Sequence, residues 1–76
     1  MRVVWDPLAL DDWKRLRMQE AADVAASVER WAATGEGVVY AAGGGEFRLF
    51  VGASAVVVFF LDDHADTMHV WQVRRP

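Results

Sequence analysis

Three arginines in the second half of this chain could act on a phosphate: Arg48, Arg74 and Arg75. A guanidinium such as that of Arg48 can stabilise the charge that develops on a phosphorus centre during a reaction. Arg74 and Arg75 are adjacent cations and can attract a polyanion. Simpler explanations also exist, because Arg48 can pair with Glu46 or with an acid on a neighbouring strand, and Arg74 with Arg75 can form a solubilising tail.

A group of aspartate and histidine side chains follows near the end of the chain and resembles a site for a hard metal ion. Aspartate is a common turn former, and no HExxH or similar spacing is present. We therefore expect a polar turn here, with no metal and no cofactor. His69, the histidine of the group that lies in a predicted strand, could act as a general base. A single histidine on a strand more often packs or faces water. The group consists of Asp62, Asp63, His64, Asp66 and His69.

The composition is that of a small, acidic and apolar chain. Its 76 residues are enough for one domain, 54% of them are hydrophobic, and the formal net charge is −3. Nucleic-acid-binding proteins usually carry an excess of basic residues, so this balance argues against tight binding to RNA or DNA by the chain alone. The lack of cysteine excludes disulfides and thiolate metal sites and favours a reducing compartment.

The N-terminus and the apolar runs indicate a cytoplasmic protein. The first residues, MRVVWDPLALDDWK, lack the basic head and apolar run of a signal peptide. The longest strongly apolar run, Ala55–Leu61, is far shorter than the roughly 20 residues that a membrane helix needs. We therefore expect a soluble chain with no membrane partner.

The stretch Glu46–Leu61 predicts two neighbouring strands joined at Gly52–Ser54. Its first part alternates between two faces, as half-buried strands do. The second part, Ala55–Leu61, is apolar on both faces, which is typical of a central strand or of a strand whose second face meets a partner. One face then carries Phe47, Leu49, Val51, Val57, Phe59 and Leu61, and the other carries Arg48, Phe50, Val56, Val58 and Phe60.

The N-terminal half predicts a strand and two helices. Arg2–Trp5 is a short β-rich run, Asp6 is a favoured helix N-cap, and Pro7 is favoured at the first helical position. No glycine or proline occurs between Pro7 and Gly35. Gly35 is the predicted end of this helical region. One helix over this span would be about 42 Å long, too long for so small a domain. We therefore expect two helices with a break near Arg17–Glu20.

The last strand is predicted at Thr67–Arg74, after the polar turn. Simple alternation places Met68 and Val70 on one face and Trp71 and Val73 on the other.

The glycine-rich segment Gly35–Gly45 is expected to form a short strand or an extended loop. The order of elements is then strand, helix, helix and a run of antiparallel strands. This order predicts a single domain over residues 1–76 with an α+β fold. We expect an antiparallel sheet of three to four strands after the helices, with the helices on one face.

Five segments of the chain, taken in order, resemble the RelE/ParE superfamily of toxins from bacterial type II toxin–antitoxin pairs. The third segment has an aromatic residue, a basic residue and an apolar-rich strand that ends in glycine, as the family has, and together the five segments cover nearly the whole chain. The segments are Asp6–Leu10, Trp13–Leu16, Phe47–Gly52, Phe59–Asp63 and Val70–Arg75.

The resemblance implies a toxin that is neutralised by a cognate antitoxin, a segment of which wraps the toxin. Nucleolytic members of the family cleave mRNA on the ribosome by 2′-OH attack, whereas other members poison DNA gyrase. Arg48 matches a basic position on the strand after the loop, and Arg74 or Arg75 matches the basic end of the last strand. The resemblance therefore implies Arg48, Arg74 and Arg75 as catalytic residues of an mRNA interferase.

The chain departs from the nucleolytic pattern at several positions. Phe50 and Val56 stand where basic residues are expected, and the C-terminal tail that can supply a catalytic Tyr or His is missing from this sequence. An apolar face suits a protein partner, so Phe50, Val56, Val58 and Phe60 are the expected partner-binding residues. The alternatives to an mRNA interferase are thus a catalytically silent RelE-like binding module or homodimer, and a ParE-like gyrase inhibitor.

Overall fold

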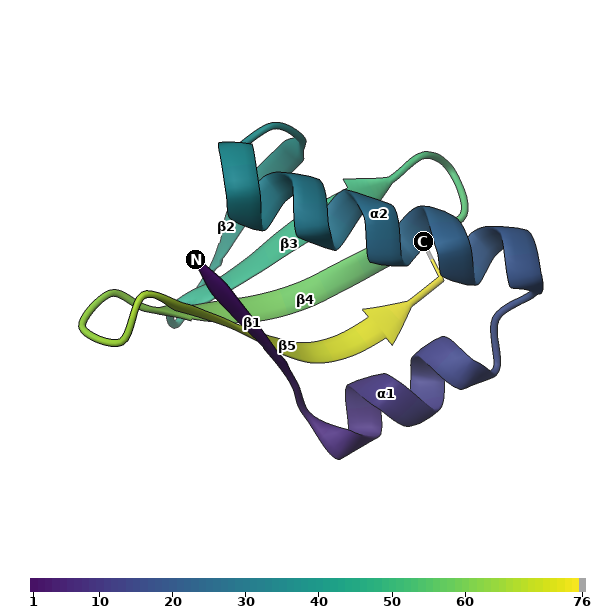
Figure 1. The fold of residues 1–76 in the computed structure, drawn as a ribbon, viewed down its shortest axis with the longest axis horizontal. Coiled ribbons are helices and arrows are strands. Elements are labelled where there is room, and N and C mark those ends of the chain that lie inside the picture. Colours follow the sequence, from purple (N-terminus) through teal and green to yellow (C-terminus); the bar gives the residue numbers. More distant parts are fainter. Residues whose placement is uncertain (76) are drawn as a thin grey trace.

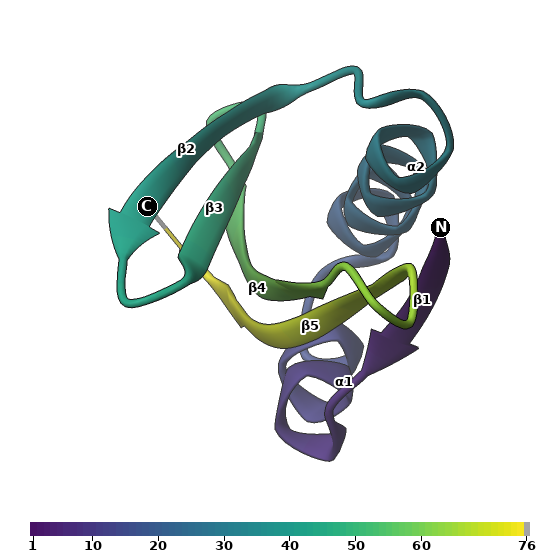
Figure 2. The same ribbon diagram turned by 90° about the vertical axis from the view of Figure 1, so that its left-hand side faces the viewer.

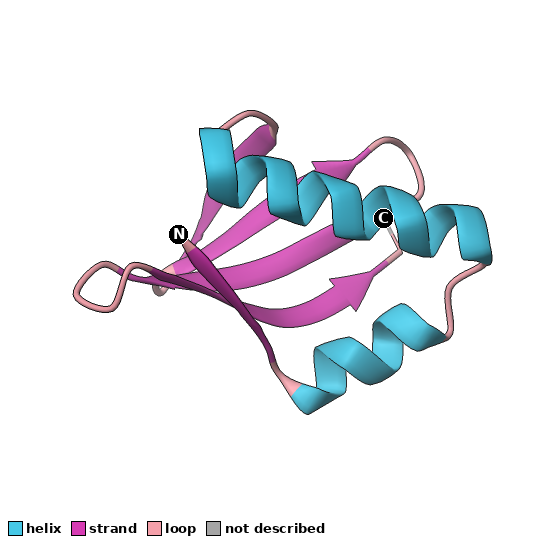
Figure 3. Ribbon diagram, viewed as in Figure 1, coloured by secondary structure: helices cyan, strands magenta, loops and turns pink. Residues whose placement is uncertain are grey.

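One curved sheet of five strands carries both helices in the computed structural model, which describes residues 1–75 (Figures 1 and 3). The strand order from edge to edge is β1-β5-β4-β3-β2, with β1 parallel to β5 and every other pair antiparallel. The predicted α+β class and the four antiparallel strands after the helices are confirmed. The strands are β1 (Arg2–Trp5), β2 (Val38–Gly43), β3 (Glu46–Val51), β4 (Ala55–Asp62) and β5 (Thr67–Arg74).

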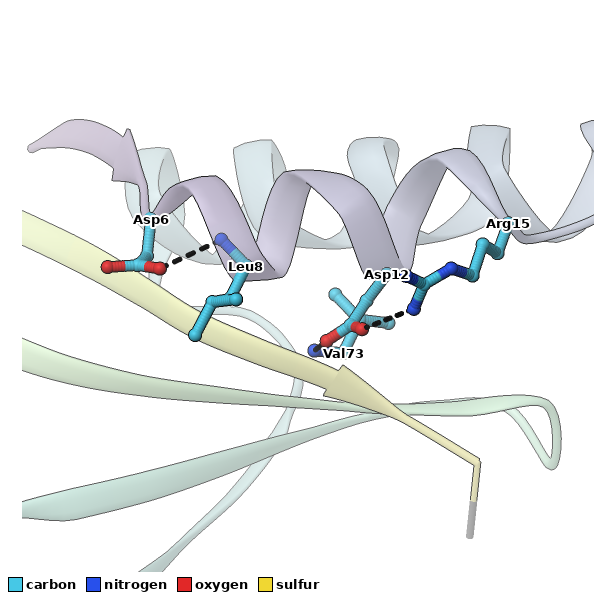
Figure 4. Close-up of polar contacts among 5 residues, drawn as sticks. All are labelled: Asp6, Leu8, Asp12, Arg15 and Val73. Atoms are coloured by element: carbon cyan, nitrogen blue, oxygen red, sulfur yellow. Dashed lines mark hydrogen bonds and ion pairs between the residues drawn. The ribbon is translucent and has the colours of Figure 1, made fainter.

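The first helix, α1 (Pro7–Lys14), begins as the sequence predicts. The Asp6 carboxylate accepts a hydrogen bond from the Leu8 N–H at 2.9 Å, which satisfies one of the free donors of the first turn (Figure 4). The second helix, α2 (Met18–Thr34), ends at Gly35, which has φ 76° and donates its N–H to Trp31 O at 2.8 Å. Only glycine adopts this left-handed conformation without a steric cost.

The break between the helices is present, but it lies earlier than predicted. The α1 helix ends at Lys14, and Arg17 is already the N-cap of α2. The Glu20 carboxylate accepts a hydrogen bond from the Arg17 N–H at 3.4 Å. Glu20 is therefore a first-turn residue of α2, where an acid also suits the helix dipole. The prediction missed this boundary because neither glycine nor proline marks it.

The hydrophobic core lies between the helices and one face of the sheet. Val24 and Val28 of α2 and Ala9 of α1 are fully buried and share one cluster with Leu49 and Phe59 of the sheet. Figure 4 shows α1 and α2 on the same side of the sheet. The predicted set of inward residues on β3 and β4 is therefore confirmed. Burying an aliphatic or aromatic side chain of this size contributes about 1.5–3 kcal/mol.

A β-bulge in β5 changes which side chains face the core. Val70 pairs with Phe59 and Gln72 pairs with Val58, so Trp71 is an extra residue between two register positions. The prediction that Val73 shares a face with Trp71 is wrong, because Val73 is buried in the core while Trp71 is exposed. The bulge shifts the alternation by one residue.

Neither helix within residues 1–75 combines the length and the apolar character that crossing a bilayer requires.

Candidate functional site: the open sheet face

The face of the sheet opposite the helices is called here the open face. Figure 2 shows the helices on one side of the curved sheet, and within residues 1–75 no helix covers the other side. The register of β3 against β4 pairs Arg48 with Val58 and Phe50 with Val56 on this face. The predicted grouping of these side chains on a second face is therefore correct.

The open face carries a pocket of about 310 Å³ at the end where β5 finishes. Its lining comes from four strands, which are β5, β4, β3 and the edge strand β2, and from the residue that follows β5. All three arginines predicted as catalytic line this pocket, together with two of the four residues predicted to bind a partner. The arginine pocket is lined by Tyr40, Arg48, Phe50, Val56, Arg74 and Arg75.

The bulge at Trp71 brings Arg74 to this pocket. Strict alternation from Met68 and Val70 would place Arg74 on the core face. With the bulge, Arg74 instead pairs with Val56 on the open face. Because of this bulge, Arg74 lines the same pocket as Arg48, although the two residues are far apart in the sequence.

Arg48 is held by the carboxylate of Glu46 on the same strand. Its Nε and Nη2 atoms donate to Glu46 Oε2 at 3.2 and 3.1 Å, and both side chains are partly buried. The hydrogen bonds that Arg48 donates to Glu46, with a smaller contribution from Tyr40, raise the pKa of the Arg48 guanidinium above its ordinary value. Arg48 therefore stays charged throughout the neutral range.

Arg74 and Arg75 have different partners. Arg74 Nε donates to the neutral Gln72 Oε1 at 2.7 Å, and no ion pair joins Arg74 to a carboxylate within residues 1–75. Arg75 Nη1 lies 3.8 Å from Glu20 Oε2 and is largely exposed. Of the three guanidinium groups in the pocket, that of Arg74 is therefore the least neutralised by a carboxylate and the most available to an anionic ligand.

Tyr40 is a pocket residue that the sequence did not reveal as functional. It lies on the edge strand β2 with 44% of its surface exposed, and its ring stacks on Phe50 at 5.3 Å with an interplanar angle of 27°. Its pairing with Arg48 in the sheet places the hydroxyl-bearing ring beside a guanidinium. The signal in the sequence was a lone tyrosine in a glycine-rich segment, which did not distinguish a strand from a loop.

The four predicted partner-binding residues are not equally accessible. Val56 is 7% exposed and Val58 is fully buried, although neither belongs to the core under the helices. Phe50 and Phe60 are half-buried. The more exposed apolar residues on this face are Val38, Tyr40 and Trp71.

A second hollow on the open face contains Phe60 and lies apart from the arginine pocket. Phe60 and Trp71 meet edge to face, with ring centroids 6.4 Å apart. His69, which was considered as a general base, pairs with Phe60 in the sheet and lines this hollow. The structure therefore does not bring His69 together with Arg48, Arg74 and Arg75.

The acidic segment after β4 forms the predicted turn. Asp62 Oδ1 accepts hydrogen bonds from the backbone N–H groups of His64 and Ala65, both at 3.1 Å. Such side-chain bonds to the following backbone are typical of aspartate in turns. Within residues 1–75, no three side chains from His, Cys, Asp and Glu are grouped in a way that could hold a metal ion.

Several solved structures that share this arrangement of strands and helices are described as toxins or as toxin–antitoxin complexes. A YoeB/ParE toxin from Agrobacterium tumefaciens superposes with a TM-score of 0.81 at 19% identity, over 100% of this chain and 99% of its own. The chain has the RelE/YoeB toxin fold. A chain of the intact RelBE toxin–antitoxin complex of E. coli has a TM-score of 0.79 at 11% identity, over 99% of this chain and 95% of its own.

The same RelE/YoeB fold recurs in a dimeric toxin. The YoeB dimer from Staphylococcus aureus has a TM-score of 0.76 at 12% identity and covers 100% of this chain and 97% of its own. No protein-family model matches the sequence, and no curated protein is significantly similar to it. The likeness therefore lies in the three-dimensional arrangement of the strands and helices.

Proposed function

We propose that this chain is the toxin of a type II toxin–antitoxin pair and that it binds mRNA on the ribosome with the arginine pocket. The observation that supports this most is the convergence of Arg48, Arg74 and Arg75 on one pocket of the open face. Guanidinium groups bind phosphate with paired hydrogen bonds, and Arg74 lacks a carboxylate partner within residues 1–75. The RelE/YoeB fold also supports the proposed toxin function, since several solved structures with this fold are toxins.

The pocket also offers a surface for a base. Tyr40 and Phe50 form a stacked pair at its edge. Base stacking on an aromatic side chain is tolerant of sequence and is worth about 1–3 kcal/mol per base. A nucleotide could thus place its base on Tyr40 and its phosphate on Arg74, with Arg48 on the neighbouring strand.

In the proposed reaction the 2′-OH of one nucleotide attacks the adjacent phosphorus and gives up its proton to water. A 2′,3′-cyclic phosphate forms, and the bond from phosphorus to the 5′-oxygen of the next nucleotide breaks. Negative charge accumulates on the phosphate oxygens during this step, and the guanidinium groups of Arg48 and Arg74 stabilise it. The Tyr40 hydroxyl, which lines the pocket, can donate a proton to the departing 5′-oxygen and regain one from water. A substrate bound to the ribosome implies that the protein acts in the cytoplasm.

The antitoxin partner is proposed to cover the open face. Tyr40 and Trp71 leave 44% and 40% of their surfaces exposed on this face, and Tyr40 lies beside the cations of the arginine pocket. A segment with apolar and acidic side chains would complement both features and would exclude RNA from the pocket.

A second candidate is a protein that does not cleave RNA, either a gyrase inhibitor or a catalytically silent binding module. The observation in its favour is that neither a histidine nor a carboxylate lines the arginine pocket within residues 1–75. Such groups are the most frequent general acids and bases.

A reconstituted translation system with mapping of mRNA ends separates the two candidates. The first predicts cleavage of ribosome-bound mRNA by the wild type, and a loss of about 100-fold or more in rate for Arg48→Ala and Arg74→Ala. Arg30→Ala, on an exposed face of α2, is the matched control and should cleave normally. Intact mRNA in the presence of folded wild-type protein would favour the second candidate.

A further inference from the structure

A separate pocket lies where β1, α1 and α2 come together. It has a volume of about 220 Å³ and shares no residue with the arginine pocket. Its lining combines two indoles, two aliphatic side chains and one carboxylate. The interhelix pocket is lined by Trp5, Leu10, Trp13, Ala25 and Glu29.

The aromatic walls of the interhelix pocket are fixed in place. The rings of Trp5 and Trp13 lie with centroids 6.3 Å apart at 59° to each other. Trp13 Nε1–H donates to Ala21 O at 2.8 Å, which ties the indole of α1 to the backbone of α2. The polar edge of Trp13 is thus satisfied, and the π-face is the part of the ring left for a ligand.

Glu29 gives this pocket a negative rim. Its side chain is exposed, and no hydrogen bond or ion pair joins its carboxylate to another residue within residues 1–75. Other acids facing neighbouring elements are engaged, such as Asp12 with Arg15 and Glu20 with Arg75. A carboxylate beside two indole faces attracts a cation with an apolar stem, because the ring faces and the carboxylate are all negative.

We propose that the interhelix pocket binds the side chain of an arginine from a peptide segment of a partner protein. A guanidinium is planar and weakly hydrated, stacks on indole faces and pairs with a carboxylate. Its methylene stem would pack against Leu10, which is 37% exposed. This site is independent of the proposed toxin function, since it uses none of the arginine-pocket residues.

Titration of the ¹⁵N-labelled protein with N-acetyl-arginine amide tests the site by NMR. The indole N–H signals of Trp5 and Trp13 should shift and saturate, while those of Trp31 and Trp71 should stay in place. N-acetyl-citrulline amide has the same shape without the charge. It should bind about tenfold more weakly, because a cation–π contact and an exposed ion pair are lost together.

Two variants complete the test. Glu29→Gln should weaken binding of the arginine probe about threefold, as expected for one exposed ion pair. Glu36→Gln, which changes an exposed glutamate outside the pocket, should leave binding unchanged. Equal affinity for the two probes, equal shifts of all four indole signals, or no saturating shift of Trp5 and Trp13 would overturn the proposal.

Discussion

The carboxylate of Asp12 on α1 accepts a hydrogen bond from the backbone N–H of Val73 on β5 at 3.3 Å (Figure 4). Val73 immediately precedes Arg74, so this contact ties the first helix to the strand end that supplies the arginine pocket. Asp12 also accepts from Arg15 Nη1 at 3.5 Å, which holds its carboxylate from the other side. The helix therefore supports the site from the opposite face of the sheet.

Replacing Asp12 by alanine should destabilise the fold through this contact. The Val73 N–H would lose its partner at a partly buried position, which costs about 1–2 kcal/mol. Asp12→Asn keeps an acceptor oxygen and should therefore lose less of the free energy of unfolding than Asp12→Ala. Urea unfolding gives the free energies, with Asp11→Ala at the exposed neighbouring position as the control. Equal stability of Asp12→Ala and Asp11→Ala would show that the contact contributes nothing.

Because Trp71 is the extra residue of the bulge in β5, the fold should tolerate its deletion unusually well. Without Trp71, the residues from Val70 to Arg74 alternate regularly, and Val73 and Arg74 keep their faces. Deletion of Trp71 should cost only about 1–2 kcal/mol, mainly through the lost aromatic contact with Phe60.

Deletion of His69 is the matched comparison for the bulge. It would move Trp71 into the core position of Val70 and would overpack the core. We expect it to cost about 1–3 kcal/mol more than deletion of Trp71. Equal free energies of unfolding for the two deletions would contradict the register described here.

Local signals predicted most of the fold, whereas long-range geometry decided the site. Asp6 and Gly35 predicted helix ends correctly because caps depend on adjacent backbone groups. The face of Val73 was predicted wrongly because a bulge leaves no mark in the strand itself. The approach of Arg74 to Arg48 depends on that bulge and on the strand order, neither of which follows from the residues alone.

Gly37 is a position where a side chain cannot be added without strain. Its φ is 146°, and a Cβ atom would lie 2.9 Å from Leu49 Cδ1, a fully packed core atom. Gly37→Ala should lower the free energy of unfolding by about 1–3 kcal/mol. Gly44 also has a positive φ, but a Cβ atom added there would meet open space, so Gly44→Ala should lower the free energy of unfolding by less. Thermal or urea unfolding measures both variants. A larger loss for Gly44→Ala would contradict this packing.

Tyr40 is expected to contribute to RNA binding through its ring. Tyr40→Phe keeps the stack on Phe50 and should bind a short single-stranded RNA nearly as well as the wild type. Tyr40→Ala should weaken binding by about 1–3 kcal/mol. Fluorescence anisotropy with labelled RNA measures both. An equal loss in the two variants would show that the hydroxyl, and not stacking, is responsible.

The most direct test of the proposed toxin function is expression of the chain alone in a bacterial host, without an antitoxin. Growth and incorporation of labelled amino acids should stop soon after induction. Arg48→Ala and Arg74→Ala should relieve the arrest, whereas Arg30→Ala should not. Normal growth with soluble, folded wild-type protein would contradict a toxin, and arrest by Arg48→Ala and Arg74→Ala as strong as that of the wild type would contradict the arginine pocket as its site.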